Sequence, residues 1–145
     1  MAASAFTVLN SAKKKLVDGT IDLDTHTFKA ALLTQAVTLS AASTVDTYAE
    51  ISSQVTGTGY TAGGATLSGV TLNESSGTVT FDANDVSWAS STITAKYVVI
   101  YDDTATNKDI LGFVDLNTDS GSATVSSSNG TFTVQWNASG IFAIA

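Results

Sequence analysis

The stretch Thr92–Leu116 constrains the fold of this chain more than any other part of its sequence. Two runs rich in β-branched and aromatic residues, TITAKYVVIY and ILGFVDL, flank a polar segment of Asp, Thr and Asn. Such runs on either side of a polar turn are typical of an antiparallel β-hairpin. Tyr97–Tyr101 is apolar at successive positions, which indicates a central strand covered on both faces. The sequence therefore predicts a hairpin that is buried on at least one face.

Most of the remaining chain follows the same pattern. With the two strands of the hairpin included, the expected strands are Thr27–Leu33, Ala65–Asn73, Thr78–Ala83, Ser91–Tyr101, Ile110–Asn117, Ser122–Ser126, Thr131–Trp136 and Ile141–Ala145. The dipeptide Asn129-Gly130 predicts a tight hairpin turn, because both residues tolerate positive φ. Short strands with regular turns predict a mainly β fold, an antiparallel β-sandwich of the immunoglobulin-like or jelly-roll-like kind.

The N-terminal segment differs from the rest. A partial helical stripe over Ala3–Val17 predicts a short helix or arm, which Gly19 ends by taking a left-handed conformation. We expect residues 1–20 to form this arm and residues 21–145 to form a single β-sandwich domain. A short helix or the start of a strand is expected near Val45–Ile51. The Gly-punctuated stretch Gln54–Gly64 is expected to be a loop with positive φ angles and a close backbone approach.

The apolar positions of these strands define an expected core. Its members are Phe28, Leu32, Leu67, Val70, Phe81, Val86, Trp88, Ile93, Tyr97, Val99, Leu111, Phe113, Val134, Trp136 and Phe142. For Trp88, an anchoring role at a protein interface is the alternative to burial. The chain has 145 residues, of which 43% are hydrophobic, so one domain with a substantial core is expected.

Charge and composition narrow the range of partners. Charged residues make up 13% of the chain, about half the share usual for a domain. A surface poor in charge suits contact with other protein chains, and a solvated, Thr-rich sandwich explains it equally well. The net charge is −7 and every basic residue is Lys, which argues against nucleic-acid binding. The basic cluster Lys13–Lys15 is too short to change that expectation.

Few residues suggest chemistry. Cysteine is absent, so there is no disulfide or thiolate site, and no apolar run is long enough to span a membrane. The N-terminus lacks the pattern of a signal peptide. The single His26 has no Gly-x-Ser-x-Gly motif to accompany it, and Asp102 and Asp103 are expected to cap a turn. No catalytic residue, cofactor or metal site is predicted.

One acidic stretch begins like a calcium-binding loop. Asp115, Asn117 and Asp119 have alternate-position spacing, but Ser120 and Ser126 occupy the places where an EF-hand needs Gly and Glu. A turn capped by Asp and Asn is the favoured interpretation, and a weak cation site stays open.

Six segments together resemble a recurrent family of small virion proteins of tailed bacteriophages. They are Asp22–Thr34, Val55–Leu72, Phe81–Trp88, Ser91–Thr106, Ile110–Leu116 and Phe132–Ile144. Lys96 stands near a position where the family often has Arg. The resemblance implies a non-enzymatic capsid decoration (cement) protein, made in the host cytoplasm, that binds the major capsid protein on the capsid exterior. By analogy with the family, self-association as a homotrimer is expected.

The expected partner contacts lie in the arm and in one loop. They are Phe6, Leu9, Lys13, Lys14, Lys15 and Tyr60. A tail, neck or baseplate component of the same kind of particle is the first alternative. A glycan-binding module that uses Tyr48, Tyr60 and Trp88 is the second.

Overall fold

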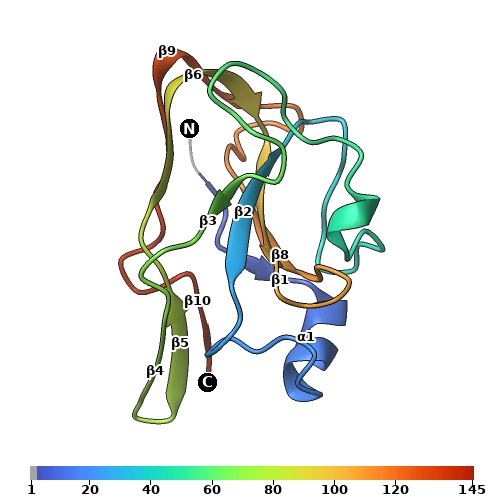
Figure 1. The fold of residues 1–145 in the computed structure, drawn as a ribbon, viewed down its shortest axis with the longest axis vertical. Helices are drawn as coiled ribbons and strands as arrows, with labels where there is room; N and C mark the ends of the chain where they lie inside the picture. The colour runs from blue at the N-terminus through green and yellow to red at the C-terminus, as the bar shows by residue number, and fades with distance from the viewer. Residues whose placement is uncertain (1–2) are drawn as a thin grey trace.

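The computed structural model describes residues 3–145, and it is mainly β with antiparallel sheets and one short α-helix near the N-terminus (Figure 1). This arrangement is β-sandwich-like, as predicted. The strands are β1 (Thr7–Val8), β2 (Phe28–Leu33), β3 (Ala65–Thr66), β4 (Thr71–Ser75), β5 (Thr78–Asp82), β6 (Val86–Ala95), β7 (Tyr97–Asp102), β8 (Ile110–Asp115), β9 (Val125–Val134) and β10 (Phe142–Ile144). The helices are α1 (Asn10–Val17) and the 3₁₀ turn η1 (Tyr48–Glu50).

The largest sheet is built around the hairpin that the sequence predicts. Its five strands follow the order β1-β8-β7-β2-β3. β7 pairs antiparallel with both β2 and β8, and all six of its residues are buried. A strand with both faces covered has apolar residues at successive positions, which explains the run Tyr97–Tyr101. The predicted central hairpin is therefore confirmed.

Two smaller sheets complete the fold. A three-stranded sheet has the order β10-β5-β4, and β6 pairs with β9 to form a long two-stranded ribbon. In Figure 1 the ribbon lies at the upper end and the β4–β5 hairpin at the lower end. Phe28 of β2 and Phe81 of β5 meet edge to face at 5.4 Å between ring centroids, which joins the two larger sheets through the core.

The expected core is largely the observed one. Thirteen of the fifteen expected residues are buried, from Phe28 in β2 to Trp136 after β9. The other two, Val70 and Phe142, are only partly buried and pack against the outside of the core.

Lys96 divides a segment that we expected to be one strand. The prediction of a single strand over Ser91–Tyr101 is wrong, because β6 ends at Ala95 and β7 begins at Tyr97 in a different sheet. The Lys96 amide donates to the Leu33 carbonyl, and its own carbonyl accepts from the Leu116 amide. The chain thus passes from the ribbon to the five-stranded sheet at this residue.

The prediction of a turn at Asn129-Gly130 is also wrong. β9 continues through both residues, so the two strands expected on either side of them form one strand. Asn129 has a φ of 48°, and the register of β9 against β6 shifts between Ser91 and Ile93. Of the two residues that the sequence indicated for positive φ, Asn129 has it and Gly130 does not, and at Asn129 it belongs to a β-bulge within a strand rather than to a turn between strands.

The N-terminal segment is more extended than expected. The helix begins at Asn10 rather than at Ala3, and Thr7–Val8 pairs with β8 as the edge strand of the large sheet. Gly112 of β8 lies beside this strand, opposite Val8, and a Cβ there would stand 2.3 Å from the Thr7 carbonyl oxygen. Residues 3–8 therefore pack directly on the sheet. From here on, the term N-terminal arm means these residues alone and no longer the whole of the expected segment 1–20.

The loop expected over Gln54–Gly64 is present. Gly64 has a φ of 73°, and a Cβ at this position would stand 1.9 Å from the Ala30 carbonyl oxygen. This confirms the close backbone approach predicted from the glycines. After the loop, the expected strand Ala65–Asn73 is divided into β3 and β4.

Candidate functional site

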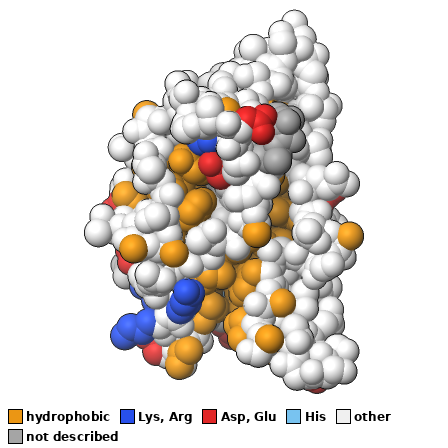
Figure 2. Space-filling model, turned by 180° about the vertical axis from the view of Figure 1, so that it is seen from behind, with side chains coloured by type: hydrophobic (Ala, Val, Ile, Leu, Met, Phe, Trp, Pro, Cys, Tyr) orange, Lys and Arg blue, Asp and Glu red, His pale blue; other side chains and the backbone are white. Residues whose placement is uncertain are grey.

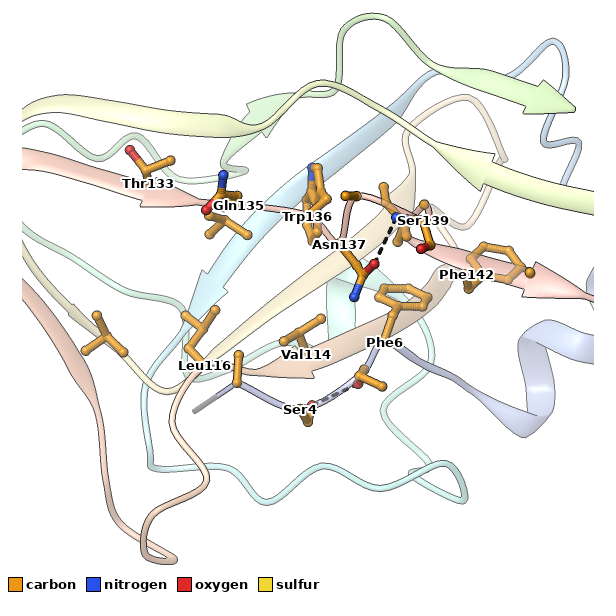
Figure 3. Close-up of a pocket in the computed structure, with 18 of the residues that line it drawn as sticks. Ser4, Phe6, Val114, Leu116, Thr133, Gln135, Trp136, Asn137, Ser139 and Phe142 are labelled. Carbon is orange, nitrogen blue, oxygen red and sulfur yellow. Dashed lines mark hydrogen bonds between the residues drawn. The ribbon is translucent and has the colours of Figure 1, made fainter. Parts of the chain in front are cut away.

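An open groove of about 960 Å³ lies between the N-terminal arm and the C-terminal part of the chain (Figure 3). The N-terminal arm forms one side, and the end of β9 with the residues after it forms the other. Val114 and Leu116, from β8 and the residue that follows it, lie between these sides. Segments far apart in the sequence therefore build the groove together.

Hydrogen bonds and ring contacts hold the two sides in place. The Ser4 amide donates to the Asp115 carbonyl at 2.8 Å, and the Asp115 amide donates to Ser4 Oγ at 2.9 Å. Phe6 of the arm stacks on Phe142 of β10, with 5.6 Å between ring centroids. On the opposite side, the Trp136 indole donates to the Asn84 carbonyl at 3.1 Å. The groove is thus a preformed feature of the fold.

None of the described residues that line the groove has a charged side chain. Its surface comes from alanines, branched aliphatic residues, aromatic rings and small polar groups such as Thr133 and Asn137. On the face drawn in Figure 2, hydrophobic side chains gather in a hollow while charged side chains lie around it. The chain as a whole has a net charge of −7, so the uncharged lining of the groove differs from the rest of the molecule. Such a surface suits an uncharged protein segment better than an ionic ligand.

Two of the residues expected to contact a partner have inward positions. Phe6 is half-buried and forms part of the groove. Leu9 is only 1% exposed and belongs to the core, so the expectation that it contacts a partner is wrong. Its place at the start of α1 turns it toward the sheet, where its amide donates to the Leu111 carbonyl.

The three lysines of α1 differ in exposure. Lys13 and Lys14 are exposed, and Lys14 pairs with Asp18 one helical turn later. Lys15 is mostly buried and bonds Asp109 at 2.7 Å and Asp46 at 3.3 Å. Burial by itself lowers the pKa of Lys15, but the hydrogen bonds and charges of the two carboxylates outweigh it and raise that pKa. Lys15 therefore anchors the helix, while Lys13 and Lys14 remain available at the surface.

Tyr60 also has an internal role. Its hydroxyl accepts from the Leu32 amide at 3.0 Å and donates to Gln54 Oε1 at 3.1 Å. Burial raises the pKa of Tyr60 to about 12. Tyr60 does not line the groove to which Phe6 contributes.

The aromatic residues considered for glycan binding are turned inward. Trp88 is 7% exposed and packs against Phe132 and Tyr60. Tyr48 stacks on Tyr101 at 4.6 Å between ring centroids. A sugar-binding platform needs an aromatic face open to solvent, and these three residues do not form one.

A polar cluster surrounds the single histidine. His26 Nδ1 lies 2.6 Å from Oδ2 of Asp102, whose side chain is fully buried. The other Asp102 oxygen accepts from the Thr104 and Ala105 amides. The printed sequence did not indicate this pair, because 75 residues separate its members. The Asp22 amide nitrogen lies 3.3 Å from the same His26 Nδ1, so the histidine links the turn that begins at Asp22 to the end of β7.

The loop that begins like a calcium site is occupied by a lysine. Lys96 is 2% exposed, and its Nζ lies 2.6 Å from the Asn117 carbonyl oxygen and 2.9 Å from Asp115 Oδ1. The ammonium group thus takes the position that a cation would take among these oxygens. Within residues 3–145, no three His, Cys, Asp or Glu side chains lie where they would hold a metal ion.

Comparison with models of known protein families, with curated proteins and with solved structures finds no match. Neither of the helices in the described residues is long and apolar enough to cross a membrane.

Proposed function

We propose that this protein is a structural component of a tailed-bacteriophage particle, namely a capsid decoration protein. In this proposal it binds the outer surface of the major capsid protein lattice as a homotrimer and stabilises the head. The observation that carries the proposal is the uncharged, preformed groove, together with the resemblance of the sequence to small virion proteins.

The physical requirements of a clamp agree with this molecule. Binding energy that exists only in the assembled shell shifts the equilibrium toward the shell by mass action. Repeated contacts around a symmetric lattice multiply weak individual affinities. A chain that works in this way needs a rigid fold and a neutral contact surface, and the buried sheet and the groove provide both.

Binding to heads tests the proposal directly. The purified protein is mixed with tailed-bacteriophage heads that lack it, and the mixture is sedimented. We expect the protein to sediment with the heads and cryo-electron microscopy to place its density at threefold or quasi-threefold positions. Failure to sediment with heads would exclude the decoration role.

Copy number separates this role from the alternative of a tail, neck or baseplate component. Quantitative mass spectrometry of purified particles should find the protein in numbers comparable to the capsid protein. A few copies per particle, with density confined to the tail, would support the alternative instead.

A further inference from the structure

The groove lies between two sheet edges. β9 pairs with β6 on one side, and within residues 3–145 no strand pairs with its other side. Across the groove, β1 is the last strand of the five-stranded sheet. Main-chain groups along a free edge need hydrogen-bonding partners, so a free edge is a ready site for an added strand.

The part of β9 that lines the groove lacks the features that normally protect an edge. Proteins block free edges with lysines, prolines or bulges. The segment Thr131–Trp136 has no charged residue and no proline, and the bulge lies before it at Asn129. Phe132, Thr133 and Val134 from this segment line the groove. The edge is therefore both open and uncharged where it meets the apolar surface.

The shape and charge of the groove specify what would fit beside this edge. An extended strand turns alternate side chains to opposite faces, so one set would enter the apolar groove and the other would face solvent. Because no charged side chain lines the groove, a charge on the inward set would lose its hydration without gaining a partner. The matching segment is thus extended, uncharged and apolar at every second position.

We propose that the groove receives such a segment from the major capsid protein, which pairs with the free edge of β9 as an additional strand. This inference rests on the proposed function, since the decoration role supplies the partner. It adds the contact site, the conformation of the bound segment and its chemical character.

Single-cysteine variants test the site, because the chain has no cysteine of its own. Thr133→Cys places a thiol at a residue of β9 that lines the groove, and Ser75→Cys places one at the end of β4, in the three-stranded sheet. Both positions are exposed, and Ser75 does not line the groove. Each variant carries a maleimide-linked benzophenone, is bound to heads that lack the protein, and is irradiated.

We expect the probe at position 133 to cross-link to one uncharged segment of the capsid protein, and the probe at position 75 to give severalfold less product. Equal cross-linking from both positions, or cross-links to a charged or helical segment, would overturn the inference. If the unlabelled chain does not sediment with heads at all, the proposed function fails as well, so the two failures are distinguishable.

A charge placed in the groove gives an independent readout. Ala5→Lys introduces an ammonium group on the arm side of the groove, and Ala89→Lys introduces one on β6 away from it. Both alanines are exposed, so we expect both variants to fold. Matching thermal midpoints of unfolding check this. We expect Ala5→Lys to weaken binding to heads by about tenfold or more and Ala89→Lys to leave it unchanged. Equal binding by both variants would contradict a strand in the groove.

Discussion

Lys96 shows how one residue organises a whole loop. Its ammonium group contacts the Asn117 and Ser120 carbonyl oxygens and the Asp115 carboxylate, and its side chain is almost completely buried. Burying a charge is costly unless it is paired and hydrogen-bonded, and each of these oxygens contributes to that pairing. The loop after β8 therefore depends on a lysine that lies before β7.

Replacing this lysine should destabilise the protein strongly. Lys96→Met keeps much of the apolar stem but leaves buried oxygens without a donor, so we expect the free energy of unfolding to fall by about 2–4 kcal/mol. Urea denaturation measures the change. Lys14→Met removes an exposed ion pair and serves as the control, with an expected loss below about 0.5 kcal/mol. Similar losses for both variants would contradict the role assigned to Lys96.

Substitutions of Asn129 test whether the bulge in β9 needs a residue that tolerates positive φ. Its φ of 48° is accessible to Asn and Gly but unfavourable for a β-branched residue. Asn129→Val should therefore lower the free energy of unfolding by about 1–2 kcal/mol, whereas Asn129→Gly should be nearly neutral. Chemical denaturation compares the two, and a neutral valine variant would show that the bulge is not required.

At the scale of elements, the arm and β8 are matched to each other. β8 has a glycine in the middle of an otherwise bulky, buried strand, at the place where β1 of the arm pairs with it. The arm in turn brings Phe6 against Phe142, which completes one end of the groove. The position of a short edge strand thus depends on the absence of a single side chain.

Adding that side chain should displace the arm. A Cβ in Gly112→Ala would lie 2.7 Å from the Phe6 ring and closer still to the Thr7 carbonyl, so we expect a loss of about 1–3 kcal/mol in stability. Hydrogen exchange should increase at the amides of Thr7 and Leu9, which face β8 in the antiparallel pairing. Gly121→Ala, where the added Cβ meets nothing within 4 Å, is the control. Unchanged exchange in Gly112→Ala would show that the arm does not depend on this contact.

At the scale of the whole molecule, ionisable groups define the pH range of full stability. Burial raises the pKa of Tyr60 to about 12, and the carboxylates around Lys15 raise the pKa of its ammonium above 10.5 despite the opposing effect of burial. Hydrogen bonds from Thr25 and the Asp24 amide lower the pKa of Asp22, and those from the Asp46 amide and Thr47 lower the pKa of Glu50. The first two groups hold their protons more tightly in the folded state, and the last two hold them less tightly.

Thermal stability should therefore fall at both ends of the pH scale. The raised pKa values of Tyr60 and Lys15 contribute stability that is complete below about pH 10 and is lost as the pH rises further. The lowered pKa values of Asp22 and Glu50 contribute stability that is complete above about pH 5 and is lost as the pH falls further. Calorimetry should find a plateau in the melting temperature between these limits. A continuous rise into alkaline solution would contradict these assignments.

The local patterns in this chain predicted its fold class well but its candidate site poorly. The alternation and the buried run Tyr97–Tyr101 are properties of neighbouring residues, so they could be recognised without a structure. The groove could not, because its two sides are the N-terminal arm and the residues around Trp136, which lie at opposite ends of the chain. Its one local signal was the absence of charge from Ser120 to Ala145.

What the sequence alone determined is thus the β character, the central hairpin and the positive φ of Asn129, because side-chain periodicity and backbone sterics act between near neighbours. Only the tertiary structure decided that Asn129 forms a bulge rather than a turn, that Lys96 separates two strands and that Leu9 is buried. The physical reason is the same in each case: a residue's local preference allows more than one arrangement, and long-range packing selects between them.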